Sequence, residues 1–328
     1  MPANLPPPYF EAEKRFREAK TTEEKIEALE EMLTIMPKHK GTDKLKADLR
    51  RRIAKLRTEA RQKKGTAKRD TAFSIEKEGA AQVVLVGAPN TGKSSLVAVM
   101  TNARPEVADF PHTTWKPTPG MVPFENIQFQ LVDTPPVTKD YLDPWMADLM
   151  RRADILLIML DLHADPLQQM EDTFAILESL RIFPEGALIP KDIRKLPFIK
   201  KMLIIMNKTD SEKDEEDYNA FLELAGVSVP CMAVSTLKGR NLTRLLEVLY
   251  SISGLIRVYT RAPGKEPNMK APFVLPAEST LEDLAANIHK DFVDKLKYAK
   301  VWGKAVFDGR MVQRDYVLQD GDIVELHI

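Results

Sequence analysis

The 328-residue sequence has only one cysteine, no excess of charge of either sign and no long apolar run. Cys231 alone cannot form an intrachain disulfide, which favours a reducing compartment. Apolar runs such as Ile155–Leu160 are far shorter than the ~20 residues that span a bilayer, and the proline-rich start lacks a signal-peptide pattern. Lys plus Arg and Asp plus Glu both number 48, so net charge indicates no partner. These absences predict a cytoplasmic protein without membrane attachment.

Three regions follow one another along the chain, which suits its length. Helical spacing of the apolar residues at 26–36 and 45–56 predicts an N-terminal helical hairpin and a linker over residues 1–80. From 81 to 262, apolar strands alternate with helical stretches, which predicts an α/β fold whose mostly parallel sheet has helices on both faces. Residues 268–328 combine a strand, a capped helix and short strands, which predicts a small ubiquitin-like α+β domain. The strands expected in the central region are Val83–Val86, Ile127–Val132, Ile155–Leu160, Leu203–Met206 and Val229–Val234.

The N-terminal region contains a strongly basic stretch. Between Lys38 and Arg69 there are fourteen Lys and Arg residues against three acidic ones. Such a stretch can attract a phosphate backbone through counterion release, but a solvated linker has the same composition, and both interpretations remain open. No aromatic residue lies within it, so base stacking is not indicated there.

The most informative stretch is Gly87–Ser94, which reads Gly-Ala-Pro-Asn-Thr-Gly-Lys-Ser between an apolar strand and an apolar-periodic helix. This is the pattern of a phosphate-binding loop, in which the glycines let backbone N–H groups face an anion at a helix N-terminus. Lys93 is then expected to reach the outer phosphates, and the Ser94 hydroxyl to ligate magnesium. The residues of this segment expected at the nucleotide are Gly87, Pro89, Asn90, Thr91, Gly92, Lys93, Ser94 and Ser95.

A second motif indicates which base the nucleotide carries. Asn207-Lys208-Thr209-Asp210 follows the strand Leu203–Met206. The Asp210 carboxylate can accept hydrogen bonds from both N1–H and the 2-amino group of guanine, a donor pair that adenine lacks. Asn207 is expected to brace neighbouring loops, and the Lys208 stem to cover the ring. A P-loop kinase or ATPase is therefore disfavoured.

Further residues complete the expected site. Ser235, Thr236 and Leu237 follow the strand Val229–Val234, where backbone amides would contact the guanine oxygen. Asp133 ends the strand Ile127–Val132 and is expected to be the magnesium carboxylate. Thr114 is expected to close on magnesium and the γ-phosphate, with Thr113 as the alternative.

These motifs, in this order, resemble the Obg-like GTPases, and among them most closely the developmentally regulated GTP-binding (DRG) family. The basic hairpin, the segment Arg151–Asp154 and a C-terminal region similar to a TGS domain support the resemblance. It implies binding of GTP and GDP and slow magnesium-dependent hydrolysis, with Lys93, Thr114 and Asn90 as catalytic residues. It also implies a potassium ion beside Asn90, association with ribosomes or RNA, and a regulatory protein partner bound through the TGS-like domain.

The sequence departs from the family pattern after the magnesium aspartate. The family has Asp-x-x-Gly there, whereas this chain reads Asp133-Thr134-Pro135-Pro136, and proline has no N–H to donate to a γ-phosphate. Val137 stands where some GTPases carry a water-orienting glutamine. Two functions therefore stay open: a slow GTPase switch acting on ribosomes or RNA, and a guanine-nucleotide-binding adaptor that does not hydrolyse GTP.

Overall fold

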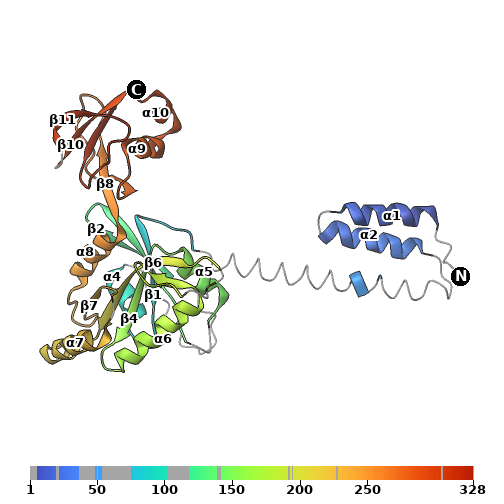
Figure 1. Ribbon diagram of the computed structural model, residues 1–328, viewed down its shortest axis with the longest axis horizontal. Helices are drawn as coiled ribbons and strands as arrows, with labels where there is room; N and C mark the ends of the chain where they lie inside the picture. The colour runs from blue at the N-terminus through green and yellow to red at the C-terminus, as the bar shows by residue number, and fades with distance from the viewer. Residues whose placement is uncertain are drawn as a thin grey trace. The chain divides into compact units, whose positions relative to one another are not determined.

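The computed structural model describes most of the chain, and two compact units, Met1–Ser74 and Ile75–Ile328, divide it (Figure 1). The described residues are 6–19, 22–36, 49, 51–53, 75–101, 118–138, 142–190, 193, 195–226, 228–303 and 306–327. Thr113, Thr114 and most of the basic stretch lie outside them. Within the described residues, no helix has the length and hydropathy that crossing a membrane requires.

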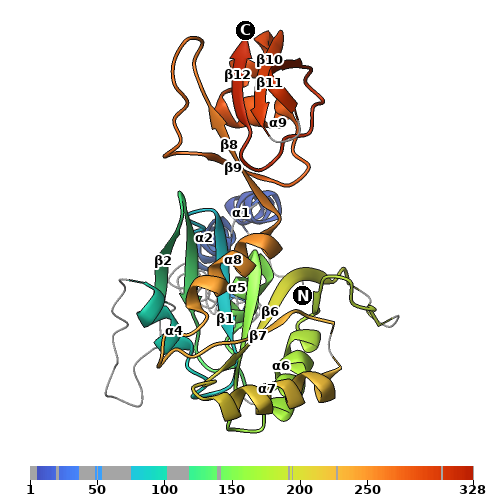
Figure 2. The same ribbon diagram turned by 90° about the vertical axis from the view of Figure 1, so that its left-hand side faces the viewer.

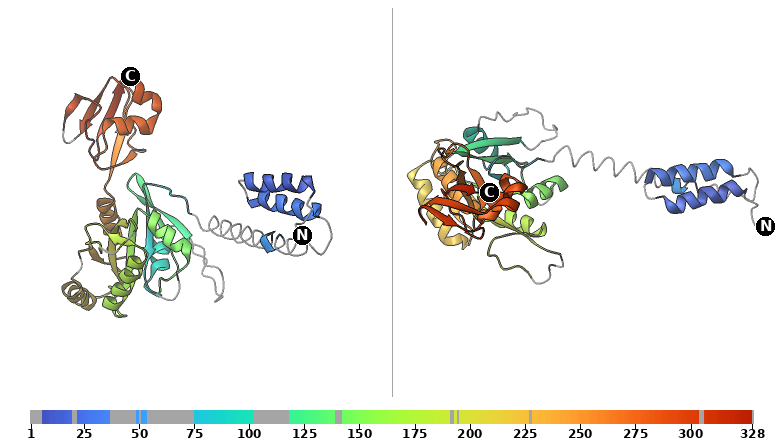
Figure 3. Two further views of the ribbon diagram at one scale, coloured as in Figure 1. Left: turned by 45° about the vertical axis from the view of Figure 1, so that its right-hand side comes forward. Right: turned by 90° about the horizontal axis from the view of Figure 1, so that it is seen from above.

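The first unit contains a pair of helices, α1 (Pro7–Glu18) and α2 (Thr22–Ile35), which lie side by side (Figure 3). α2 is the helix expected from the spacing at 26–36. α1 was not expected, because its prolines suggested an irregular start, although proline is well tolerated in the first turn of a helix. One buried cluster joins these helices to two residues of the second expected helix; it consists of Tyr9, Ala12, Leu29, Met32, Met36, Leu49 and Ile53.

The second unit begins with a seven-stranded sheet of order β2-β3-β1-β4-β6-β5, in which β7 also pairs with β6. Every pairing is parallel except that of β2 with β3. The mostly parallel sheet expected from the sequence is confirmed. Its strands are β1 (Ala81–Val86), β2 (Thr118–Phe124), β3 (Ile127–Asp133), β4 (Ile155–Asp161), β5 (Ile182–Pro184), β6 (Phe198–Asn207) and β7 (Cys231–Ala233).

Helices cover both faces of this sheet (Figure 2). On one face, α4 (Lys93–Met100) and α8 (Leu242–Ser253) pack against strand residues such as Leu85 and Leu157. Side chains alternate along a strand, so the equally buried Val84 and Ile158 face the other side, where α6 (Pro166–Ser179) contacts β4 and β5. The remaining helices are α5 (Pro144–Arg152) and α7 (Glu212–Ala225). The carboxyl ends of β1, β3, β4 and β6 consequently meet at one edge, where open α/β sheets bind ligands.

A smaller five-stranded sheet follows, of order β11-β10-β12-β8-β9. Its first strand starts directly after Gly254, with no connector, so Leu255–Thr260 pairs within this sheet, although the sequence placed these residues in the central region (Figure 1). The apolar run from α8 into β8 carries no turn signal except Gly254, so the sequence offers little to mark a boundary there. The elements are β8 (Leu255–Thr260), β9 (Phe273–Pro276), α9 (Leu281–Ile288), α10 (Lys290–Lys295), β10 (Tyr298–Gly303), β11 (Val306–Val312) and β12 (Ile323–His327).

The turn between β2 and β3 contacts the smaller sheet. Arg257 of β8 forms an ion pair with Glu125 of this turn. It also forms a bidentate ion pair with Asp320, with N–O distances of 2.9 and 3.1 Å. Tyr250 of α8 donates to Asp320 at 2.6 Å and lies under the Arg257 guanidinium. The neighbouring turn residue Asn126 hydrogen bonds to the Tyr259 hydroxyl. The two sheets are therefore joined by a network of charges in which Arg257 is largely shielded from solvent, whereas Glu125 and Asp320 are partly exposed.

Asp320→Asn is expected to reduce the free energy of unfolding at neutral pH. Burial alone raises the pKa of Asp320, but the hydrogen bonds from Arg257 and Tyr250 outweigh it, and the pKa falls to about 2. Because the folded pKa lies below the ordinary 3.8, this stabilisation is complete above about pH 4 and is lost as the pH falls through about 2. The shift corresponds to roughly 2.5 kcal/mol, which solvent screening of this partly exposed side chain reduces to about 1 kcal/mol.

Urea denaturation of the wild type and the variant at pH 7 and pH 3 measures this effect. The gap between their midpoints should be widest at pH 7 and should narrow at pH 3. Asp315→Asn, at an exposed carboxylate of the same domain, is the control and should match the wild type at both pH values. Equal midpoints of Asp320→Asn and the wild type at pH 7 would show that the network does not stabilise the chain.

Candidate nucleotide-binding site

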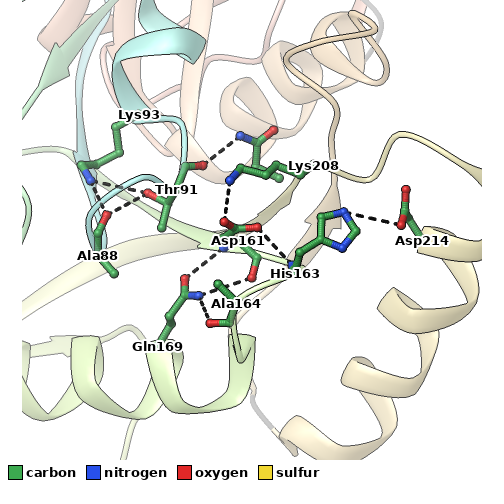
Figure 4. A network of polar contacts seen from close by, with 10 residues as sticks. Ala88, Thr91, Lys93, Asp161, His163, Ala164, Gln169, Lys208 and Asp214 are labelled. Atoms are coloured by element: carbon green, nitrogen blue, oxygen red, sulfur yellow. Dashed lines mark hydrogen bonds and ion pairs between the residues drawn. The ribbon is translucent and has the colours of Figure 1, made fainter.

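The phosphate-binding loop predicted at Gly87–Ser94 joins β1 to α4, as its sequence pattern requires (Figure 4). The Lys93 side chain is buried and turns back along the loop, donating to the carbonyl oxygens of Gly87 and Ala88 at 3.0 and 2.7 Å. Thr91 supports the same curve by donating to the Ala88 carbonyl at 3.1 Å. Burial lowers the pKa of Lys93 to about 8, against the opposing effect of Asp133. The ammonium group is thus held at the centre of the loop.

Both glycines of the loop lie so close to neighbouring strands that a side chain at either position would clash. Gly92 has φ +94°, and a Cβ there would lie 2.2 Å from Nδ2 of Asn207. At Gly87 a Cβ would lie 2.3 Å from the backbone carbonyl oxygen of Met159 in β4. Pro89, Asn90 and Ser95 are exposed on the outer side of the loop and the start of α4, and Asn90 has φ +62°.

Asp133 ends β3 beside the loop, where the sequence predicted a magnesium carboxylate. Burial raises its pKa, partly offset by a hydrogen bond from Ser94 and by Lys93. Its Oδ1 is buried and has no hydrogen-bond partner among the described residues. A carboxylate oxygen with spare lone pairs beside a serine hydroxyl fits the oxygen ligands that Mg²⁺ prefers. The described residues contain no cluster of three His, Cys, Asp or Glu side chains, so a coordination shell that includes these two oxygens needs ligands of other kinds, such as phosphate, water or a hydroxyl.

The Asn207–Asp210 segment follows β6 and connects three loops. Nδ2 of Asn207 donates to the Thr91 carbonyl at 2.8 Å, and its Oδ1 accepts from the backbone N–H of Thr236 at 3.2 Å. Asp210 accepts from the Ser235 hydroxyl. Leu237 is 78 % exposed. The phosphate loop, the Asn-Lys-Thr-Asp segment and the loop after β7 therefore form one hydrogen-bonded unit at the carboxyl edge of the sheet.

The segment after Asp133 is bonded to the phosphate loop. The Thr134 hydroxyl donates to the Leu85 carbonyl at 2.6 Å, and the Val137 N–H donates to the Gly87 carbonyl at 3.1 Å. The sequence left open whether Val137 supplies the N–H that Pro136 lacks. In this structure that N–H is already engaged with the protein.

Sequence reasoning missed a second polar cluster at the same edge. Asp161 ends β4 and binds the Lys208 ammonium at 2.5 Å, while Gln169 and the backbone of His163 hydrogen bond to it (Figure 4). The available signal was its position, because a carboxylate directly after a buried strand is the pattern that identified Asp133. Thr113 and Thr114 lie outside the described residues, so their expected roles stay predictions.

Comparison with known proteins gives the family. Residues 82–208 match the family described as 50S ribosome-binding GTPase, and residues 256–328 match the TGS domain. The TGS match begins one residue into β8, in agreement with the position of that strand in the smaller sheet.

Relatives align along nearly the whole chain. A GTP-binding protein of Methanocaldococcus jannaschii is 29 % identical over 93 % of this chain and 93 % of its own length. Developmentally-regulated GTP-binding protein 1 of Xenopus laevis is 25 % identical over 92 % of this chain and 98 % of its own. Ribosome-interacting GTPase 1 of Saccharomyces cerevisiae is 25 % identical over 93 % and 99 %.

Among solved structures, the YchF GTPase of Schizosaccharomyces pombe superposes with a TM-score of 0.52 at 13 % identity, over 77 % of this chain and 99 % of its own. A GTP-binding protein from Pyrococcus horikoshii gives 0.50 at 18 % identity, over 75 % and 99 %. At such identities these two likenesses establish the fold alone. From the matched G and TGS domains and the full-length relatives, the chain is a member of the Obg/DRG-like GTP-binding proteins.

Proposed function

We propose that this protein binds GTP and GDP with Mg²⁺ at the carboxyl edge of the larger sheet, hydrolyses GTP slowly and acts as a switch on ribosomes or RNA. The observation that carries the proposal is the double hydrogen bond of Asn207. It joins the phosphate loop to the loop after β7, so that one side chain links the regions expected to hold the phosphates and the base. The ribosomal partner is supported by the family description and by the yeast relative's name.

The proposed roles follow from the position of each side chain. Lys93 neutralises the outer phosphates, and the loop N–H groups and the start of α4 supply further positive potential. Ser94 and Asp133 hold Mg²⁺, which when bound draws charge from the leaving phosphate oxygens. Asp210 selects guanine, with Ser235 fixing its carboxylate. Thr114 as a magnesium ligand and Asn90 as a potassium contact complete the proposal on the strength of the resemblance.

A specific contact favours the alternative, a guanine-nucleotide adaptor that does not hydrolyse GTP. Pro136 has no N–H, and the N–H of Val137 donates to Gly87 instead of pointing to where a γ-phosphate would lie. In that case the segment after Asp133 would not distinguish GTP from GDP, and the nucleotide would stabilise the fold without driving a cycle.

Single-turnover assays with GTP, Mg²⁺ and either K⁺ or Na⁺ separate the two functions. Release of γ-phosphate above the buffer rate, faster in K⁺, supports the switch. Release at the buffer rate in both salts, together with equal affinities for GTP and GDP, supports the adaptor. Lys93→Ala is the control for contaminating GTPases, and its rate should fall to that of buffer.

Reversing the charge of the lysines between Lys44 and Lys64 is expected to weaken co-sedimentation with ribosomes. Each lost phosphate contact removes counterion release, so the binding constant of the wild type should fall more steeply with salt than that of the variant. Sedimentation of both proteins at several salt concentrations measures the difference in slope. Identical binding at every salt concentration would make the basic stretch a linker only.

A further inference from the structure

The end of β4 is built around a carboxylate that the proposed function has not yet used. Asp161 is 6 % exposed and stands opposite Asn207 in the parallel pairing of β4 with β6. Its Oδ2 lies 2.5 Å from the Lys208 ammonium, and its Oδ1 accepts from the His163 backbone N–H at 3.0 Å. Both carboxylate oxygens are engaged, so its orientation is determined.

The surroundings of Asp161 hold it further in place (Figure 4). Its backbone N–H donates to Oε1 of Gln169 at 3.0 Å, and Nε2 of Gln169 donates back to its carbonyl at 3.3 Å. The His163 ring lies 3.6 Å from Asp214, which in turn caps the start of α7 and accepts from the N–H of Asp210. Asp161, His163 and Asp214 thus form a chain of contacts that runs from β4 to α7.

Lys208 is fixed at both ends of its side chain. Its backbone has φ +66°, a conformation kept in place by Asn207 on one side and by the Thr209 N–H bond to Val234 on the other. Its ammonium is fixed by Asp161. The four-carbon stem between these points is therefore ordered, two residues before Asp210 in the chain, and an aliphatic stem covers apolar surface well.

We propose that Asp161 is a positioning residue for guanine: by holding the Lys208 ammonium, it keeps the lysine stem flat against the face of a base whose edge is bound by Asp210. This inference rests on the proposed guanine-nucleotide function and extends it to a residue outside the recognised motif. The ion pair acts before the nucleotide arrives, because a stem that is already ordered loses less conformational entropy on binding.

A double-mutant cycle tests the coupling. Asp161→Asn removes the charge that holds the ammonium and is expected to raise the dissociation constant for GDP roughly tenfold, within the range of couplings between contacting residues. Lys208→Met keeps an unbranched apolar stem but has no ammonium for Asp161 to hold. In that background, Asp161→Asn should change GDP affinity by less than about twofold if the carboxylate acts through the lysine.

The other end of the same strand offers a matched control. Asp154 precedes β4 and binds one lysine, Lys77, and one backbone N–H, that of Gln82 at 2.9 Å. Asp154→Asn therefore removes the same kind of ion pair far from Asp210 along the strand and should leave the dissociation constant for GDP unchanged. Thermal unfolding of each nucleotide-free variant measures purely structural damage.

The outcomes separate this inference from the proposed function. If the wild type does not bind GDP or GTP, the guanine-nucleotide function itself fails. If the wild type binds but Asp161→Asn binds equally well, or weakens binding by the same factor with and without the lysine, Asp161 is structural and the positioning role is overturned. A tenfold loss that disappears in the Lys208→Met background supports it.

Discussion

Replacing Asp210 with asparagine is expected to weaken GDP and GTP binding by about 10²- to 10⁴-fold and to create binding of xanthine nucleotides. The range follows from losing two hydrogen bonds to a charged acceptor, each worth roughly 1.5–3 kcal/mol. The asparagine amide also directs a donor at the 2-amino group of guanine, which is itself a donor. In xanthine an oxygen replaces that amino group and accepts from the amide.

The structure makes this substitution informative because the position of the carboxylate is fixed without a ligand. Ser235 donates to Oδ1, and the backbone N–H of Asp210 is held by Asp214 at 2.9 Å. Asparagine keeps an oxygen for Ser235 and so should preserve the loop. Calorimetric titration with GDP and with xanthosine diphosphate measures the exchange of specificity.

Asp217→Asn is the control for this titration, since it alters an exposed carboxylate on α7 and should keep wild-type affinity for GDP. Wild-type GDP affinity in Asp210→Asn would place the base elsewhere. An absence of binding heat from the wild type with every nucleotide would remove the nucleotide site altogether.

Gly92→Ala is expected to abolish nucleotide binding in practical assays, with a loss of at least roughly 10²-fold, as misplacement of a binding group by about 1 Å can cause. The new methyl group would lie 2.2 Å from Nδ2 of Asn207, so that amide must move. Its bond to the Thr91 carbonyl would break, and the phosphate loop would lose its link to the loop after β7. A backbone cost of about 1–2 kcal/mol for an alanine in the left-handed region adds to this.

Gly186→Ala separates the clash from the backbone cost. Gly186 has φ +80°, but a Cβ there would meet no atom within 4 Å. Both alanine variants should therefore lose some thermal stability, and only Gly92→Ala should lose nucleotide affinity. GDP titration and thermal unfolding of both proteins provide the comparison, and near wild-type affinity in Gly92→Ala would contradict the proposed function of the Asn207 link.

Much of the fold was predictable because its strands are continuous apolar runs buried on both faces, as in β1 and β4. β2 escaped prediction because its seven residues include Pro119, Gly120 and Pro123. In the described part of the chain it is an edge strand that pairs only with β3, and such a strand tolerates residues without a ladder N–H. α1 was missed for the same reason, since prolines also begin it.

The residues of the candidate site also fall into those that the sequence identified and those that it did not. The phosphate loop and the Asn207–Asp210 segment were recognisable because their chemistry lies in consecutive residues. Asp161 and Val137 were not, because their roles depend on contacts with Lys208 and Gly87, which are 47 and 50 residues away in the chain and meet only after the sheet has formed. The sequence shows that Pro136 has no N–H to donate. It does not show that the N–H of the next residue, Val137, donates to the Gly87 carbonyl.

The hairpin of β2 and β3 connects the smaller sheet with the phosphate loop. β3 ends at Asp133 beside the phosphate loop, and the turn at its other end is bonded to Arg257 and Tyr259 of the smaller sheet. An extended strand resists stretching, and β3 is clamped along its length between β1 and β2. Displacement of the smaller sheet would therefore break the contacts of Glu125 with Arg257 and of Asn126 with Tyr259, at one end of a rigid strand whose other end carries Asp133.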